Sequence, residues 1–138
     1  MVQQLVNAIV LCLAAHMVGD YFLQSDWMAQ EKTKYLSVAT IHALTYSVPF
    51  IPVVIWLHAP NPGLAWLVIF VTHAIIDRYR LARHIVWFKN QFAPWVFRPT
   101  HTATGHGADR PEYLSVWLCI LVDNILHMAI NVAAAVLL

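Results

Sequence analysis

The sequence predicts an all-α fold: a polytopic membrane protein with about four transmembrane helices and an interfacial segment between the third and the fourth. Two observations predict it. The chain of 138 residues is 60% hydrophobic and 11% charged, whereas soluble domains carry about 25% charged residues and could not bury so much apolar surface in one core of this size. The apolar residues also gather in stretches near the ~20 residues that cross a bilayer.

Four stretches are the candidate spans of a single membrane domain over residues 1–138. The first is 5–23, and because no basic segment precedes it, a cleaved signal peptide is not expected. The second is 38–57, in which Pro49 and Pro52 should cause a kink. The third is 64–80, which can extend if the arginines at 78, 80 and 83 reach the interface. The fourth is 113–136.

Basic residues predict the orientation. They gather in residues 24–37 and 77–112 and are missing from the turn at 60–63. With four crossings both basic segments fall on one face, which the positive-inside rule assigns to the cytoplasm, with both termini outside. The aromatic and basic mixture in 81–112 is typical of an interfacial loop in the headgroup layer, acting as an anchor or as a lid.

Composition also predicts the partners. The eight Lys and Arg residues are too few and too scattered for a stripe that follows phosphates, so no nucleic acid is expected. The expected partner is the lipid bilayer. Because four short helices enclose little interior, a homo-oligomer is also an open interpretation.

Three acidic residues lie within or at the ends of the apolar stretches, and each has a histidine four residues away. The pairs are His16 with Asp20, His73 with Asp77, and His127 with Asp123. This spacing puts both side chains of a pair on one face of a helix. In the predicted topology every histidine is deeper than its aspartate, with layers about 6 Å apart. His42 falls at a compatible depth in the second span.

These side chains suggest a metal centre. An aspartate in hydrocarbon costs about 3 kcal/mol on insertion scales, and a divalent cation held by imidazole and carboxylate would compensate for three of them. Mixed nitrogen and oxygen ligands suit zinc, manganese or iron better than calcium. The predicted ligands are His16, Asp20, His42, His73, Asp77, Asp123 and His127. Two interpretations stay open beside it: His–Asp hydrogen bonds without metal, and aspartates that only orient the ligating histidines.

Helix bundles with Glu-x-x-His motifs on facing helices hold di-metal sites in the same general way. Two metals about 4 Å apart would fit a hydrolytic mechanism. The predicted catalytic residues are Asp20, Asp77 and Asp123. The predicted substrate-binding residues are Gln24, Arg78 and Arg80, because an arginine can grip a phosphate group. Positive-inside anchoring is the alternative role of the arginines.

The stretch from His16 to Gln24, followed by Lys32 and His42, resembles a family of small bacterial and phage integral membrane proteins. That family is classed as a domain of unknown function with the pattern H-x-x-G-D-[FY]-x-L-Q. The resemblance continues at His73–Asp77, at Thr104-Gly105 through Pro111 to Trp117, and at Asp123–His127. More distantly, the chain is similar to small inner-membrane proteins labelled metal-dependent hydrolases. The resemblance implies a multi-pass protein of the bacterial inner membrane.

Three functions compete. The leading one is a membrane-embedded metal-dependent hydrolase acting on a lipid or lipid-linked phosphate from the cytoplasmic side. The second is a proton or metal-ion transporter, since intramembrane Asp and His also mark ion pathways, although the apolar outer half of the first span, Leu5 to Leu13, counts against it. The third is a non-enzymatic accessory or phage-related envelope protein with a structural metal.

Overall fold

Helices make up the regular structure of this chain. The structure is a computed structural model, and it describes residues 2–100, 103–107 and 110–138. Within those ranges no strand is present, which confirms the predicted all-α class. Residues 101–102 and 108–109 of the predicted interfacial loop lie outside the described ranges. The chain divides into two compact units, Met1–Tyr79 with His127–Leu138, and Arg80–Leu126.

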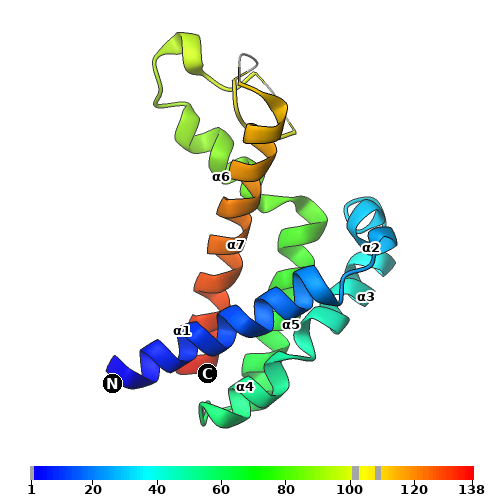
Figure 1. Cartoon of the computed structure of the whole chain (residues 1–138), viewed down its shortest axis with the longest axis vertical. Coiled ribbons are helices and arrows are strands. Elements are labelled where there is room, and N and C mark those ends of the chain that lie inside the picture. The colour runs from blue at the N-terminus through cyan, green and yellow to red at the C-terminus, as the bar shows by residue number, and fades with distance from the viewer. Residues whose placement is uncertain (1, 101–102, 108–109) are drawn as a thin grey trace. The chain divides into compact units, whose positions relative to one another are not determined.

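The first predicted span forms an α-helix that continues into a single wider, π-helical turn (Figure 1). α1 (Val2–Met17) passes directly into η1 (Val18–Phe22), a π-helical turn. The wider turn is visible in its hydrogen bonding, because the N–H of Leu23 donates to the carbonyl of Val18 five residues earlier, at 2.9 Å. Single π-turns inside helices are rare and frequent at functional sites. The expected boundaries of 5–23 are close, but the sequence did not predict the change of helix type.

Proline breaks the second predicted span, as expected. α3 (Leu36–Ser47) and α4 (Phe50–Trp56) meet at a bend of 43°. Proline has no backbone N–H, and its ring clashes with the carbonyl four residues earlier. Pro52 therefore cannot donate to Val48, whose carbonyl instead accepts from the N–H of Ile51 at 3.1 Å. Between η1 and α3 lies the short helix α2 (Asp26–Glu31), in which no residue is buried.

The third predicted span is α5 (Pro62–Tyr79). Asn61 caps its start, since its Oδ1 accepts from the N–H of Leu64 at 3.1 Å, and proline is favoured at the first helical position. The helix ends because Arg80 adopts a left-handed conformation with φ 50°. α5 therefore does not extend through the arginines at 80 and 83, which corrects that part of the expectation.

The second unit begins directly after this break. Its main helix is α6 (Leu81–Asn90), followed by the short η2 (Trp95–Phe97). Gly105 lies against α6 with φ +73°, and a Cβ there would meet the backbone of that helix at 2.5 and 2.6 Å. The side chain of Asn90 donates to the Gly105 carbonyl at 2.8 Å. The predicted loop thus contains a helix and a segment packed on it.

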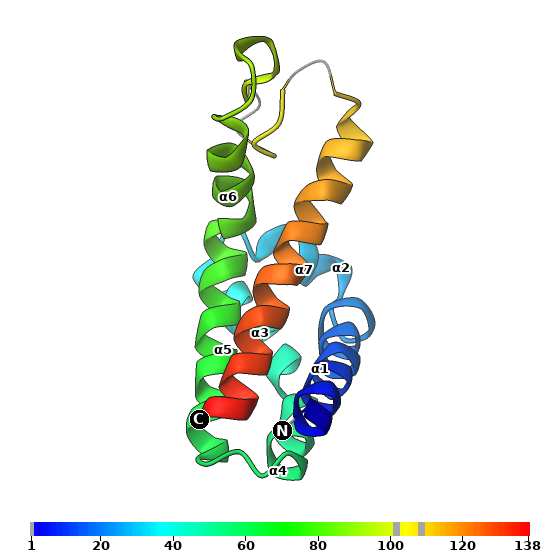
Figure 2. The same cartoon turned by 90° about the vertical axis from the view of Figure 1, so that its left-hand side faces the viewer.

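The last helix, α7 (Glu112–Leu137), starts in the second unit and ends in the first. It matches the predicted span of 113–136. The carbonyl of Leu138, just after it, accepts from the N–H of Asn61 at the start of α5. Both termini and α4 lie at the same end of the first unit (Figures 1 and 2).

The described helices support fewer spans than the four predicted. Val2–Phe22, with 21 residues, and Glu112–Leu137, with 26, are long and apolar enough to cross a membrane. The bent pair of α3 and α4 makes a third if it counts as one span. α5 is not among these candidates. Many large apolar side chains on the candidate spans are exposed, which is compatible with a membrane protein.

Small side chains build much of the core of the first unit. The buried small residues are Ala8, Cys12 and Ala15 of α1, Ala65 of α5, and Ala134 and Ala135 of α7. Tyr46 and Phe50 are the largest side chains that pack among them, and both are fully buried. Small residues let helix backbones approach closely. Helices in a bilayer associate through such close packing, because the hydrophobic effect does not favour their association there.

Candidate metal centre

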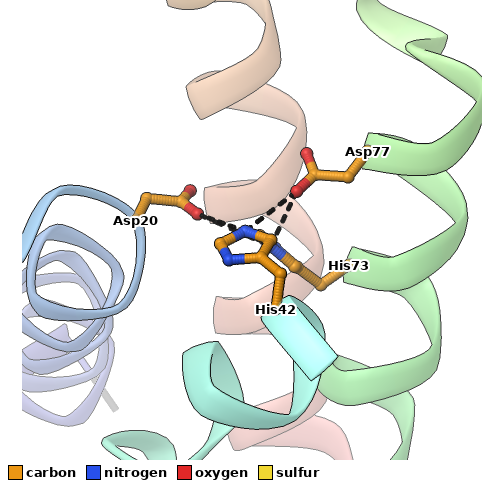
Figure 3. A group of neighbouring side chains, drawn as sticks. All are labelled: Asp20, His42, His73 and Asp77. Carbon is orange, nitrogen blue, oxygen red and sulfur yellow. Dashed lines mark hydrogen bonds and ion pairs between the residues drawn. The ribbon is translucent and has the colours of Figure 1, made fainter. Parts of the chain in front are cut away.

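Four buried polar side chains from three elements of the first unit point toward one another (Figure 3). Asp20 comes from the π-turn η1, His42 from α3, and His73 and Asp77 from α5. Both histidines are fully buried, and the side chains of Asp20 and Asp77 are 11% and 6% exposed. These residues lie on the helix faces that the spacing of four predicted.

The Nε2 atom of His42 is at the centre of the group. It lies 2.9 Å from Nε2 of His73, 3.0 Å from Oδ2 of Asp77 and 3.2 Å from Oδ1 of Asp20. Nε2 of His73 lies 3.1 Å from the same Asp77 oxygen and 3.5 Å from the same Asp20 oxygen. Two histidines and two aspartates of the predicted ligand set therefore meet at their side-chain tips.

The ligand atoms lie close enough together to share a single cation, since the four residues offer ligand atoms that all lie within 4.8 Å of one another. Zinc binds nitrogen and carboxylate oxygen at about 2.0–2.2 Å, so the ligand atoms of a tetrahedral site lie about 3.3–3.6 Å apart. Of the five separations above, the 3.5 Å between His73 and Asp20 falls in this range, and the other four, from 2.9 to 3.2 Å, are shorter, so these atoms would move apart slightly around a bound zinc. Oδ1 of Asp20 is buried and faces only the two imidazoles of the group, at 3.2 and 3.5 Å, among its contacts in the described residues. The donor set of two imidazoles and two carboxylates could bind a metal ion.

A lysine from outside the predicted spans also reaches this group. The ammonium of Lys32, the residue after α2, donates to Oδ2 of Asp77 and to Oε1 of Gln24, both at 2.7 Å. It lies 3.3 Å from Nε2 of His42. The side chain of Lys32 is 17% exposed and that of Asp77 is 6% exposed. This ion pair is therefore largely buried. A buried pair of charges interacts more strongly than a pair at the surface, because less water screens it.

A second polar layer lies beside the four ligand candidates. Nδ1 of His16 is 2.9 Å from the hydroxyl of Tyr46 and 3.4 Å from Oδ2 of Asp20. The side-chain amide of Asn131 donates to the same hydroxyl at 2.7 Å. The ring of Tyr46 stacks on His73 with centroids 3.5 Å apart. His16 is thus held next to the cluster but is outside the group of four.

His127 lies beside His73 and His16, with ring centroids 4.4 and 5.7 Å away, and its Nε2 is 4.0 Å from Oδ1 of Asp77. Its sequence partner Asp123 belongs to the second unit, one helical turn earlier on α7. The ligand roles of His16, His127 and Asp123, and the catalytic role of Asp123, stay predictions.

The predicted substrate-binding residues have other partners in the structure. Gln24 accepts from Lys32, as described above. The guanidinium of Arg78 donates to the carbonyl of Thr33 at 2.6 Å, which attaches the loop after α2 to the end of α5. Arg80 is exposed in the break between α5 and α6. Their role toward a substrate stays a prediction.

Sequence reasoning missed two members of this arrangement. Asn131 follows His127 by four residues, so the spacing that identified the His–Asp pairs could have found it. Lys32 was part of the pattern that resembles the family, but no spacing linked it to the cluster, because its contact with Asp77 joins residues 45 positions apart. The sequence placed it among the positive-inside loop residues.

Fold and cluster together define an all-helical protein with two or three helices able to cross a membrane and a buried Asp–His group that could bind a metal ion. The chain belongs to the family described as "Protein of unknown function (DUF3307)", whose model matches residues 8–138. Comparisons with curated proteins and with solved structures give no match.

Proposed function

We propose that this protein is a membrane-embedded, metal-dependent hydrolase of the bacterial inner membrane that acts on a lipid or lipid-linked phosphate. One observation carries the proposal: two imidazole nitrogens, from helices far apart in the sequence, lie 2.9 Å from each other and 3.0–3.5 Å from two carboxylate oxygens in a largely buried position. Ionisable groups at such depth are expensive and mark functional sites.

The residues divide by burial and position into ligands and a base. His42, His73 and Asp77 are the three most buried members, and three protein ligands with one further position are typical of catalytic zinc. Asp20, the most exposed of the four and the one on the π-turn, occupies the fourth position or accepts the proton of a water. A bound metal would polarise a phosphoryl oxygen and make water acidic near neutral pH.

Each carboxylate turns its second oxygen toward another imidazole. Oδ2 of Asp20 faces His16 at 3.4 Å, and Oδ1 of Asp77 faces His127 at 4.0 Å. Carboxylates that bridge in this way support the two-metal form of the proposal. The metal-to-protein ratio distinguishes one metal from two.

The substrate is proposed to approach from the cytoplasmic side, next to Gln24, Arg78 and Arg80. Arginine suits phosphate because its guanidinium can donate two parallel hydrogen bonds. A phosphate at the end of a lipid would lie at the depth where these residues leave the helices. The lipid tails would then stay in the bilayer beside the exposed apolar faces of the helices.

The proposal is tested by metal analysis and hydrolysis on protein purified in detergent. The unaltered protein should hold one or two zinc, manganese or iron ions per chain and release phosphate from lipid phosphates in mixed micelles. Asp77→Asn and His42→Ala should lose both metal and activity. His58→Ala, at an exposed histidine, is the matched control and should keep both. Folded protein without stoichiometric metal would remove the proposal.

A structural metal in a non-enzymatic accessory or envelope protein is the second candidate function. Four protein ligands in a tetrahedral arrangement close the coordination shell, as in structural zinc sites, and the cluster offers four. In that case Asp20→Asn would lower thermal stability and metal content together, and the unaltered, metal-loaded protein would release no phosphate from any lipid phosphate.

A further inference from the structure

Lys32 lies where a cation bound by the cluster would need space. Its Nζ atom is 2.7 Å from Oδ2 of Asp77 and 3.3 Å from Nε2 of His42, and both are candidate metal ligands. We propose that Lys32 is a tethered competitor of the metal, so that loading of the site requires withdrawal of this side chain. The inference rests on the metal site of the proposed function and adds a form of regulation to it.

The competition follows from the contacts of Asp77 and His42. Nε2 of His42 lies 3.0 Å from Oδ2 of Asp77 and 3.2 Å from Oδ1 of Asp20, and because carboxylate oxygens only accept, Nε2 carries the proton in this arrangement. The ammonium of Lys32 donates to the same Oδ2 of Asp77 at 2.7 Å and lies 3.3 Å from Nε2. A metal that binds Nε2 and Oδ2 must occupy the space beside both atoms, so it displaces the proton of His42 and the ammonium of Lys32 together.

Charge adds to this exclusion. The ammonium pairs with Asp77 in a place where both side chains are more than four-fifths buried. A divalent cation at the cluster would lie within a few ångströms of that positive charge, and repulsion between like charges is strong when little water screens it. With the lysine withdrawn, both carboxylates are available to the metal. With the lysine in place, one of them is already neutralised.

The surroundings of Lys32 allow its side chain to leave the cluster. The side chain is 17% exposed, so part of it already borders the surface of the first unit. Lys32 follows α2, in which no residue is buried, while Arg78 holds the backbone at the next residue through the Thr33 carbonyl at 2.6 Å. A rotation of the flexible four-carbon chain can therefore free the site without moving a helix.

Metal affinity tests the competition directly. The detergent-solubilised protein is titrated with zinc against a chromophoric chelator, beside Lys32→Met and Lys34→Met. Lys34 is the matched control because it is a loop lysine two residues further on that pairs only with Glu31, at 2.8 Å, among the described residues. Lys32→Met should bind zinc about tenfold more tightly or more, which corresponds to about 1.4 kcal/mol. Lys34→Met should bind as the unaltered protein does.

Amine labelling tests the withdrawal without any substitution. The unaltered protein is treated with a limiting amount of an amine-acylating reagent, with and without zinc, and the labelled lysines are measured by mass spectrometry. Zinc should raise the labelling of Lys32 several-fold, while Lys34 and Lys89, which are exposed, stay constant and serve as internal references.

The outcomes separate this inference from the function on which it rests. Equal zinc affinity in all three proteins, weaker binding by Lys32→Met, or unchanged labelling of Lys32 in zinc-loaded protein would each overturn the competition while leaving the metal site standing. If neither the unaltered protein nor Lys32→Met binds zinc, both the competition by Lys32 and the proposed metal site are overturned.

Discussion

At the residue scale, Gly19 sets how closely the first helix approaches α3. A Cβ at this position would lie 2.5 Å from Cδ2 of Tyr46 and 3.0 and 3.1 Å from its carbonyl oxygen and Cα. Two of these three atoms belong to the backbone, which cannot rotate away. Asp20 is the next residue, and His42 lies one turn before Tyr46 on α3. The close approach thereby keeps Oδ1 of Asp20 and Nε2 of His42 3.2 Å apart, near enough to bind one cation.

Gly19→Ala should therefore separate the two helices and weaken the site. We expect a loss of about 1–3 kcal/mol, as for other overpacked positions, together with a lower zinc affinity. Thermal unfolding in detergent, followed by circular dichroism, measures the first effect. Gly63→Ala is the control, because its added Cβ would meet only Oδ1 of Asn61, at 3.7 Å. Equal melting temperatures for both variants would contradict the packing argument.

Much of the cluster could be predicted at this scale from spacing alone. The pair His73 and Asp77 comes together with Asp20 and His42, and a period of four explains why the members of that pair share one helix face whatever the rest of the fold does. Spacing could not predict Lys32, which depends on a loop conformation. It could not rank the ligands either, since only the packed structure shows that Nδ1 of His16 lies nearer to the Tyr46 hydroxyl, at 2.9 Å, than to Asp20, at 3.4 Å.

At the element scale, the helix boundaries followed from proline and length, whereas the π-turn did not. Apolar periodicity does not distinguish a helix of 3.6 residues per turn from one that widens for a single turn. The widening places Asp20 and Gly19 against α3, so it belongs to the geometry of the site. A regular α-helix over 5–23 is what the apolar pattern predicts. A π-turn is locally less stable than an α-helical turn, and tertiary packing compensates for that cost.

The proline break between α3 and α4 releases a carbonyl that another helix satisfies. Because the N–H of Ile51 bonds to Val48, the Ser47 carbonyl loses its usual partner four residues on. The indole of Trp66, on α5, donates to it at 3.0 Å. In lipid a freed backbone group must find such a partner, because no water is available. The hydrogen bond from Trp66 to Ser47 thus links α3 to α5, the helix that carries His73 and Asp77.

Trp66→Phe should remove this bond and leave the packing in place, since a phenyl ring can still stack on Phe70 as the indole does at 5.7 Å. We expect a loss of about 1–3 kcal/mol, the cost of a buried acceptor left without a donor. Chemical unfolding in mixed micelles measures it. Trp56→Phe, at a side chain that is 71% exposed, should be neutral. Unchanged stability in Trp66→Phe would show that the carbonyl finds another donor.

At the scale of the whole molecule, the number of crossings is the main open prediction. α5 is not itself a candidate span by length and composition, yet it runs between the same two ends of the first unit as Val2–Phe22. Its start lies beside Leu138 through the N–H of Asn61, and its last turn lies beside Asp20, since both Asp20 and Asp77 contact His42. We therefore predict that α5 crosses the bilayer if Val2–Phe22 does.

This argument predicts the side of the membrane on which each connection lies. Single cysteines at Lys34, Pro60 and Lys89, all exposed positions, can be introduced in a background of Cys12→Ala and Cys119→Ser. An impermeant thiol reagent applied to spheroplasts should label Pro60→Cys and leave Lys34→Cys and Lys89→Cys protected until the cells are lysed. That pattern follows from the positive-inside rule, because the basic segments stay in the cytoplasm.

Each comparison in this experiment isolates one crossing. Pro60 and Lys89 flank α5, so labelling of both in intact cells would mean that α5 does not cross. Lys34 and Pro60 flank the bent pair α3 and α4, so labelling of both would assign that pair to a re-entrant loop. Either result would move the cluster toward one membrane surface, where two carboxylates need no metal to offset their burial, and the physical reason for a cation at His42 and His73 would weaken with it.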